Sequence, residues 1–350
     1  MTMRERLIAV LRGGPVDRVP FVQYDGCAGS TEEIWSVVGR ENMGVLRWTS
    51  AHSTHAPNCR FEQRPIVRGE RHGAITTMHT PAGSLEQEVL FQPDLGCSAT
   101  RKHYVREPND YDILLAYLRD IEIVPSPETV DQVIADLSDD GLPHVSVDRT
   151  PFQQMWIQWV CIEDLSYHLV DCPDRVHACM EAIARNVRRE CEIAAQSNAP
   201  YIVFPDNITA PVIGDRLFRE HCVPFYRELA DMLTDGGVPV FVHMDGDLAA
   251  LHSAIGESGI RGIDSLSPPP DNDTSVETAR RLWPTMRLFV NYPSSVHLAS
   301  EQAVYDQTVR ILEEDGNSGL LEIQISENVP PGAWRRTFPA IIRAIADHSG

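Results

Sequence analysis

The chain has 350 residues, of which 43% are hydrophobic, enough for a large buried core. Its 50 acidic residues against 30 basic ones give a net charge of −20. Because phosphate binding needs clustered lysine and arginine, this balance argues against a nucleic-acid partner. Lys102 is the only lysine, which excludes a P-loop lysine elsewhere in the chain.

The first third of the chain predicts a helix, a strand, a second helix and an irregular β region. The helix over 3–12 ends at two glycines, the strand covers 18–26, and the second helix covers 30–43. Residues 60–106 alternate apolar and polar side chains and are interrupted by Pro-Ala-Gly, which predicts a β-hairpin excursion.

From residue 108 onward, helices and strands alternate. Helices are predicted over 108–121, 173–197, 215–237, 247–259, 275–284, 301–316 and 334–349. Strands are predicted over 143–150, 200–207, 238–246, 260–267, 287–293 and 319–328. Short loops between them indicate a parallel sheet, and no Gly-x-Gly-x-x-Gly follows the first strand. We therefore predict a (β/α)8 TIM barrel, one domain over 1–350, with the excursion at one end.

Composition also predicts the compartment. The eight cysteines include no Cys-x-x-Cys pair, and residues 1–14 are charged, unlike a signal peptide. We therefore expect a cytoplasmic protein with free thiols, which are interpreted as small core residues. No run of 18 apolar residues occurs, so no membrane span is expected.

Polar side chains follow most of the predicted strands. Because the active site of a TIM barrel lies at the carboxyl ends of its strands, these residues are the site candidates. They are Gln23, Tyr24, Asp25, Asp148, Arg149, Asp206, Asn207, His243, Asp245, Asp264, Asn291, Tyr292, Ser326, Glu327 and Asn328.

His243 and Asp245 end the strand over 238–246. Side chains alternate along an extended segment, so both can point the same way, and Glu327 from the last strand could converge on them. An imidazole with carboxylates suits a divalent zinc, iron or manganese ion. The alternative is a histidine at a strand end that only hydrogen-bonds Asp245.

Two other candidates also have structural alternatives. Asp206 has the spacing of an N-cap for the helix that follows it. Arg149 could form an ion pair inside the mouth of the barrel.

Several motifs resemble the uroporphyrinogen decarboxylase superfamily. They are "MRERLIAVLRGGPVDRVPF" (3–21), "TPAGSL" (80–85), "PYIVFPDN" (200–207), "VHMDG" (242–246) and "ENVPPGAW" (327–334). The resemblance implies a (β/α)8 barrel and allows a homodimer. It also implies one of two activities: cofactor-free porphyrinogen decarboxylation, or zinc-dependent methyl transfer and demethylation with corrinoid proteins or thiol acceptors.

Two departures from the superfamily bear on the choice. The decarboxylase has Arg-Gln-Ala-Gly-Arg soon after the first strand, where this chain has "QYDGCAGS" (23–30). The methyltransferase branch binds zinc through His-x-Cys and a later Cys. Those positions match His243, Asp245 and Glu327, so carboxylates replace both thiolates. The resemblance therefore implies a metal site of harder ligands, with zinc favoured, and it matches Asp206 to an acidic position.

We therefore expect a demethylating methyltransferase whose metal polarises a methoxy or ether oxygen of a small-molecule substrate. A corrinoid, carried by a partner corrinoid protein, is the expected methyl acceptor. The predicted metal ligands are His243, Asp245 and Glu327; the catalytic residues Asp206, Tyr24 and Arg149; and the substrate-binding residues Asn207, Asn291 and Tyr292.

Two other functions remain open. One is a metal-assisted or cofactor-free decarboxylase or other lyase, in which Arg149 would bind the carboxylate of a small acid. The other is a non-catalytic barrel that binds a corrinoid or tetrapyrrole.

Overall fold

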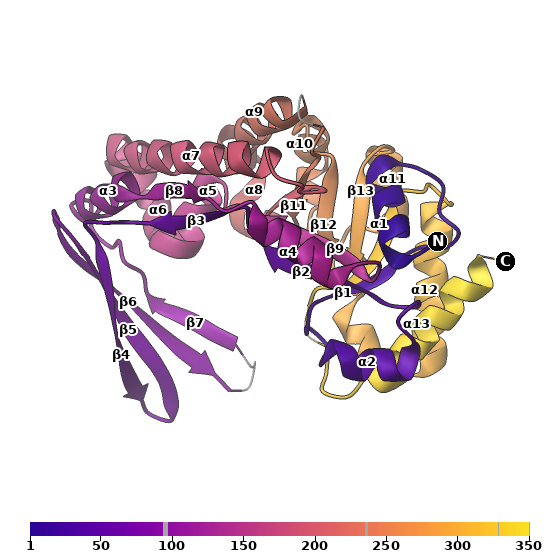
Figure 1. Cartoon of the computed structure of the whole chain (residues 1–350). Helices are drawn as coiled ribbons and strands as arrows, with labels where there is room; N and C mark the ends of the chain where they lie inside the picture. Colours follow the sequence, from indigo (N-terminus) through magenta and orange to yellow (C-terminus); the bar gives the residue numbers. More distant parts are fainter. Residues whose placement is uncertain (94–96, 235–236, 328, 350) are drawn as a thin grey trace. The chain divides into compact units, whose positions relative to one another are not determined.

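The computed structural model describes residues 1–93, 97–234, 237–327 and 329–349 (Figure 1). The chain forms two compact units. The first comprises Met1–Ala51, Ser126–Val147 and Cys191–Gly350, and the second comprises His52–Pro125 and Asp148–Glu190. That the whole chain acts as one domain stays a prediction.

The first unit is built on a closed barrel of eight parallel strands, as the sequence predicts. The order around the barrel is β1, β14, β13, β12, β11, β10, β9 and β2, and β2 pairs with β1. The bounds are β1 Phe21–Tyr24, β2 Gly44–Thr49, β9 Gly141–Ser146, β10 Ile202–Phe204, β11 Val240–His243, β12 Gly262–Leu266, β13 Arg287–Asn291 and β14 Leu321–Ile325. The barrel is the expected (β/α)8 fold.

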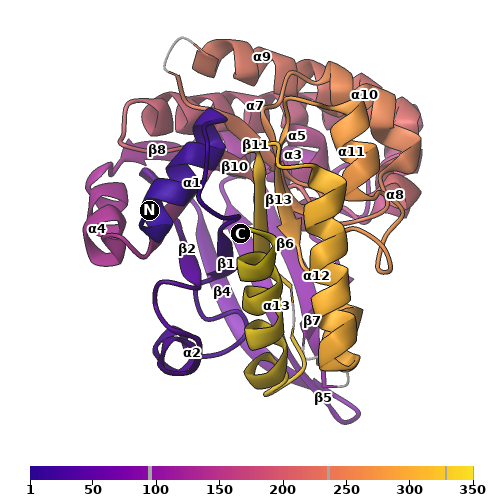
Figure 2. The same cartoon turned by 90° about the vertical axis from the view of Figure 1, so that its right-hand side faces the viewer.

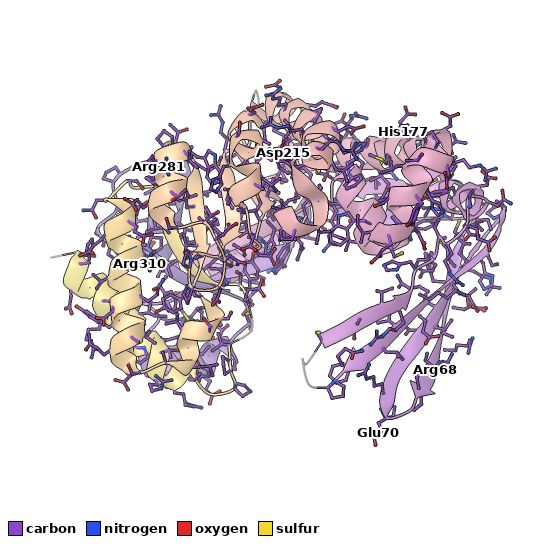
Figure 3. The ribbon with its side chains drawn as sticks, turned by 180° about the vertical axis from the view of Figure 1, so that it is seen from behind. Arg68, Glu70, His177, Asp215, Arg281 and Arg310 are labelled. Carbon is purple, nitrogen blue, oxygen red and sulfur yellow. The ribbon has the colours of Figure 1, made fainter. Side chains whose placement is uncertain are left out.

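Helices cover the outside of this barrel. Helix α12 packs between α11 and α13, and α13 also contacts α2 (Figure 2). Arg281 of α11 and Arg310 of α12 are exposed on this layer (Figure 3). The helices are α1 Met3–Arg12, α2 Thr31–Val38, α4 Glu128–Leu137, α8 Ala210–Leu217, α9 Val223–Thr234, α10 His252–Glu257, α11 Val276–Leu282, α12 Glu301–Asp315 and α13 Trp334–His348.

Helix α1 packs against the interior of the barrel. Thr2 and Glu5 form a capping box at its start, and Gly13 ends it with a φ of 68°, a conformation that favours glycine. Its apolar residues share one buried cluster with residues of six barrel strands. The cluster contains Met3, Leu7, Val10, Leu11, Val22, Tyr24, Leu46, Leu142, Tyr201, Val203, Phe241 and Phe289.

Arg6 of α1 is buried and forms a two-pronged ion pair with Asp17. Its Nε and Nη2 donate to the two carboxylate oxygens of Asp17 at 2.7 and 2.8 Å. The hydrogen bond from Arg6 holds the pKa of Asp17 well below its usual value. This carboxylate therefore stabilises the fold above pH 4 or so, the pKa it has when unfolded, and the contribution is lost as the pH falls further.

Asp17→Asn should lower the free energy of unfolding by about 1–3 kcal/mol, because the buried Arg6 loses its counter-charge. Urea denaturation at neutral pH measures this loss, and the exposed Asp231→Asn of α9 serves as control. The variant should also be less sensitive to acid than the wild type. Equal free energies of unfolding for Asp17→Asn and Asp231→Asn would contradict a stabilising role for the Arg6–Asp17 ion pair.

The second unit contains two antiparallel sheets. β3 His52–His55 pairs with β8 Glu122–Pro125, and a four-stranded sheet has the order β4–β5–β6–β7. Its strands are β4 Arg60–Arg68, β5 Arg71–Thr80, β6 Gly83–Gln92 and β7 Cys97–Lys102. The predicted hairpin excursion is therefore a larger sheet, and Arg68 and Glu70 mark the β4–β5 turn (Figure 3).

Helices complete the second unit. They are α3 Asp110–Asp120, α5 Pro151–Gln154, a π-helical turn Met155–Trp159, α6 Ile162–Asp171 and α7 Pro173–Ala195, whose last residues belong to the first unit. Among the described helices, none has both the length and the apolar character that crossing a membrane requires.

Candidate metal centre

Three predicted metal ligands meet at the carboxyl ends of two barrel strands. His243 is the last residue of β11, Asp245 follows it by two residues, and Glu327 follows the end of β14 by two. One nitrogen of His243 and one oxygen from each carboxylate all lie within 4.8 Å of one another. The structure therefore brings together residues separated by more than 80 positions in the chain.

Contacts from two sides fix the loop that carries Asp245. The Ile208 N–H, in the loop after β10, donates to the His243 carbonyl at 3.2 Å. The Asn272 side chain donates to the Asp245 carbonyl at 2.8 Å. A Cβ at Gly246 would lie 2.3 Å from the side chain of Thr209, so this close approach requires glycine.

Asp264, fully buried on β12, orients the His243 ring. The two residues are directly opposite in the strand register, and Nδ1 of His243 lies 2.8 Å from Oδ2 of Asp264. A carboxylate only accepts hydrogen bonds, so Nδ1 carries the proton. Nε2 then faces Asp245, whose Oδ2 is 3.6 Å away. Metal-binding histidines are commonly held in this way by a carboxylate behind the ring.

The Asp264 carboxylate has three further polar neighbours. The Tyr24 hydroxyl donates to Oδ2 at 2.6 Å, and Gln324 Nε2 donates to Oδ1 at 3.0 Å. His144 Nε2 lies 3.6 Å from Oδ2, and its Nδ1 lies 2.6 Å from the Tyr201 hydroxyl. Burial would raise the pKa of Asp264, but His144 and His243 together hold it well below its ordinary value. Asp264 is therefore a buried anion.

The three converging residues carry unequal charges. Burial lowers the pKa of His243, but hydrogen bonds to Asp245 and Asp264 outweigh it and raise the pKa to about 10. Burial, followed by the charge of Asp245, raises the pKa of Glu327. Burial alone would raise the pKa of Asp245 as well, but the hydrogen bond and charge of His243 lower it below its ordinary value. A positive charge beside these carboxylates is thus favourable, and a proton on His243 supplies it here.

The residues fit a divalent metal ion. Ligand atoms about 2.0–2.2 Å from one ion are at most about 4.4 Å apart, so small side-chain movements would suffice. One imidazole with two carboxylates suits zinc, iron or manganese, and three protein ligands are typical of catalytic zinc sites.

Metal affinity should increase with pH. A metal ion at Nε2 of His243 must displace the proton that this ring holds up to about pH 10. Each unit of pH should therefore raise the affinity by about tenfold between roughly pH 6 and 8. Competition with a chromophoric zinc chelator, corrected for the chelator's own protonation, measures this slope. An affinity independent of pH would contradict the assignment of His243 as a ligand.

A strained residue lies next to the centre. Ser265 has a φ of 63°, which for a residue other than glycine costs about 1–3 kcal/mol. Its hydroxyl donates to Ser326 Oγ at 2.6 Å and accepts from Gln324 at 3.0 Å. The Cys27 thiol donates to the carbonyl of Glu327 at 3.2 Å. These bonds hold the segment that presents Glu327.

The other predicted residues of the barrel lie in different surroundings. Tyr24 contacts Asp264 directly and reaches within 3.5 Å of His243 Nδ1. Asn291 is buried, donates to Ser267 and accepts from the Ser326 N–H. The Tyr292 hydroxyl donates a hydrogen bond to the Val304 carbonyl of α12 at 2.8 Å, so it links the barrel to α12. Substrate binding by Tyr292 stays a prediction.

The roles predicted for Asp206, Asn207 and Arg149 stay predictions. Asp206 is buried and accepts a hydrogen bond from Tyr226 at 2.5 Å. Thr209, not Asp206, is the residue before α8, so the N-cap interpretation of Asp206 is wrong. Asn207 is exposed with a φ of 51°. Arg149 belongs to the second unit.

The sequence does not predict the supporting roles of Asp264, His144 and Gln324. Asp264 follows from the sequence only as a polar residue near a strand end, and His144 and Gln324 lie within predicted strands. The available signal is a polar residue at the centre of an otherwise buried strand, since such groups need a buried partner. Which partner each one meets depends on strand register, which the sequence does not provide.

Comparisons with known proteins identify the family. The family model for uroporphyrinogen decarboxylase (URO-D) matches residues 2–321. The chain belongs to this enzyme family. A methyltransferase from Methanosarcina mazei is similar in structure, with a TM-score of 0.62 and 12% identity over 100% of both chains. A B12-independent methionine synthase from Shewanella sp. W3-18-1 has a TM-score of 0.49 and 10% identity over 91% of this chain and 84% of its own. The comparison with curated proteins finds no match.

Proposed function

We propose that this URO-D family member is a metal-dependent methyltransferase of the demethylating kind. The observation that carries the proposal is the convergence of His243, Asp245 and Glu327 at the carboxyl ends of the barrel strands, where barrel enzymes have their active sites. The resemblance to the family's zinc methyltransferases, with carboxylates in place of thiolates, supports the same reading.

The ligand set favours an oxygen substrate. A metal ion held by His243, Asp245 and Glu327 would act as a Lewis acid toward an ether or methoxy oxygen. Oxygen ligands leave a harder centre than two thiolates would, and hard centres prefer oxygen over sulfur. The substrate class is therefore methyl ethers rather than thioethers.

The chain's own residues would prepare this reaction. Asp264 holds the proton at Nδ1 of His243 and so keeps Nε2 directed at the site. In the transfer, the carbon–oxygen bond breaks and the methyl group passes without its bonding electrons to a nucleophilic acceptor, for which we propose a cob(I)alamin-type corrinoid. The electron pair stays on the oxygen, which is then protonated, and Asp206 is our candidate for supplying that proton.

Methyl transfer can be tested directly. The metal-loaded protein is incubated with a panel of aryl and alkyl methyl ethers and cob(I)alamin, and both the alcohol product and methylcobalamin are measured. We expect the two products in equal amounts, and loss of both in Glu327→Gln. His177→Ala, an exposed histidine of α7, is the matched control (Figure 3).

Other outcomes would replace the proposal. Release of carbon dioxide from small carboxylic acids without methyl transfer would indicate a decarboxylase, and Arg149→Gln would then test the predicted carboxylate contact. A corrinoid spectrum that changes on binding without turnover, and that is unaffected by His243→Ala, would indicate a binding protein.

A further inference from the structure

Two neighbouring pockets open at the amino ends of the barrel strands, the end opposite to the candidate metal centre. Their volumes are about 410 and 370 Å³, and they share Leu11, Arg12, Gly237, Val238 and Pro239. Between this end and the metal centre lies the apolar cluster that α1 forms with the barrel. The pockets are therefore separate from the metal centre.

Arginines from three elements line the smaller pocket. Arg12 is the last residue of α1, Arg261 directly precedes β12, and Arg287 is the first residue of β13. Arg4, also on α1, lines the larger pocket with Arg12. Neither pocket has an aspartate or glutamate among its described lining residues. We call the smaller one the basic pocket.

This concentration of positive charge is unusual for a chain of net charge −20. Several other arginines of the described residues have carboxylate partners, as in Arg6–Asp17, Arg47–Asp25 and Arg280–Asp315. Within residues 1–93, 97–234, 237–327 and 329–349, no carboxylate forms an ion pair with Arg12, Arg261 or Arg287.

The guanidinium groups of the basic pocket also repel one another. Arg287 is half-buried and donates to the carbonyls of Leu11 and Thr285 at 2.9 and 3.1 Å. These bonds fix it at the pocket wall. Burial, and next the charge of Arg261, lower the pKa of Arg287. A bound anion would relieve this repulsion.

We propose that the basic pocket binds a small-molecule dianion that carries a phosphate group or a pair of carboxylates. Both chemistries present oxygen pairs that match the planar fork of arginine, and arginine binds them through two parallel hydrogen bonds. Arg287 is held in place by its carbonyl bonds, while Arg12 and Arg261 are exposed and free of carboxylates among the described residues. This site is independent of the proposed methyl transfer.

Calorimetric titration of the full chain tests the proposal. Sodium phosphate and sodium succinate are added separately at constant ionic strength, and the anion that binds more tightly identifies the chemistry. We expect saturable binding with a Kd below about 1 mM. Arg261→Gln and Arg12→Gln should each weaken it by about tenfold or more. Arg281→Gln, an exposed arginine of α11, is the control (Figure 3).

A further variant separates this pocket from the metal centre. Glu327→Gln should bind the preferred anion as tightly as the wild type does. Several results would overturn the proposal: saturable binding of neither anion, unchanged affinity in a folded Arg261→Gln, equal weakening in Arg281→Gln, or loss of binding in Glu327→Gln.

Discussion

Replacing Asp264 with alanine is expected to lower the free energy of unfolding by about 3–5 kcal/mol, because it leaves buried charged and polar groups without their common partner. Those groups are the His243 ring, the Tyr24 hydroxyl and the Gln324 amide. Chemical denaturation of the metal-free protein at neutral pH measures the loss.

Asp264→Asn separates stability from metal binding. The amide keeps the size of the side chain but loses the charge that fixes the proton on His243. We expect a smaller loss of stability and a metal affinity reduced by about 10–100-fold, the usual effect of removing such a supporting carboxylate. Asp231→Asn should change neither quantity. A metal affinity unchanged in a folded Asp264→Asn would contradict the orienting role.

Removing a ligand should have a larger effect on metal affinity than removing its support. His243→Ala and Glu327→Gln are each expected to weaken metal binding by more than about 100-fold, since supporting residues alone account for up to that factor. Glutamine keeps the shape of Glu327 but offers only a neutral oxygen. Metal content after dialysis, measured by mass spectrometry, reports the loss.

The matched control is His177→Ala, which removes an exposed imidazole near the start of α7. It should retain the metal content and the demethylating activity of the wild type. Retention of metal by folded His243→Ala would show that this residue is not a ligand.

The barrel could be predicted because its strands and helices alternate in the sequence with clear turn signals. Buried strands such as β13 are short apolar runs, since a parallel sheet is covered on both faces. β2 was missed because "GVLRWT" has no such run and includes the partly exposed Arg47 and Trp48. The excursion was predicted as a hairpin, since strand count depends on pairings that alternation alone does not define.

The ligand candidates are predictable for a different reason. His243 and Asp245 follow from strand alternation, and Glu327 follows as a carboxylate at the end of the last strand. The resemblance adds a match of all three to the ligand positions of the methyltransferase branch. Asp264 acquires its role only through the register of β11 with β12. Tyr292 is a residue for which position alone misleads. It follows a strand end, but its hydroxyl donates a hydrogen bond to α12. A position after a strand therefore predicts a candidate, and the direction of the side chain decides its role.

The most direct test of the central claim is the metal content of the protein purified without a metal-affinity tag and then exposed in turn to zinc, iron(II) and manganese. We expect about one equivalent of one of these metals per chain, as a site of three protein ligands requires. A folded protein that retains none of the three would contradict it, and His243 would then be a buried imidazolium paired with Asp245 and Asp264.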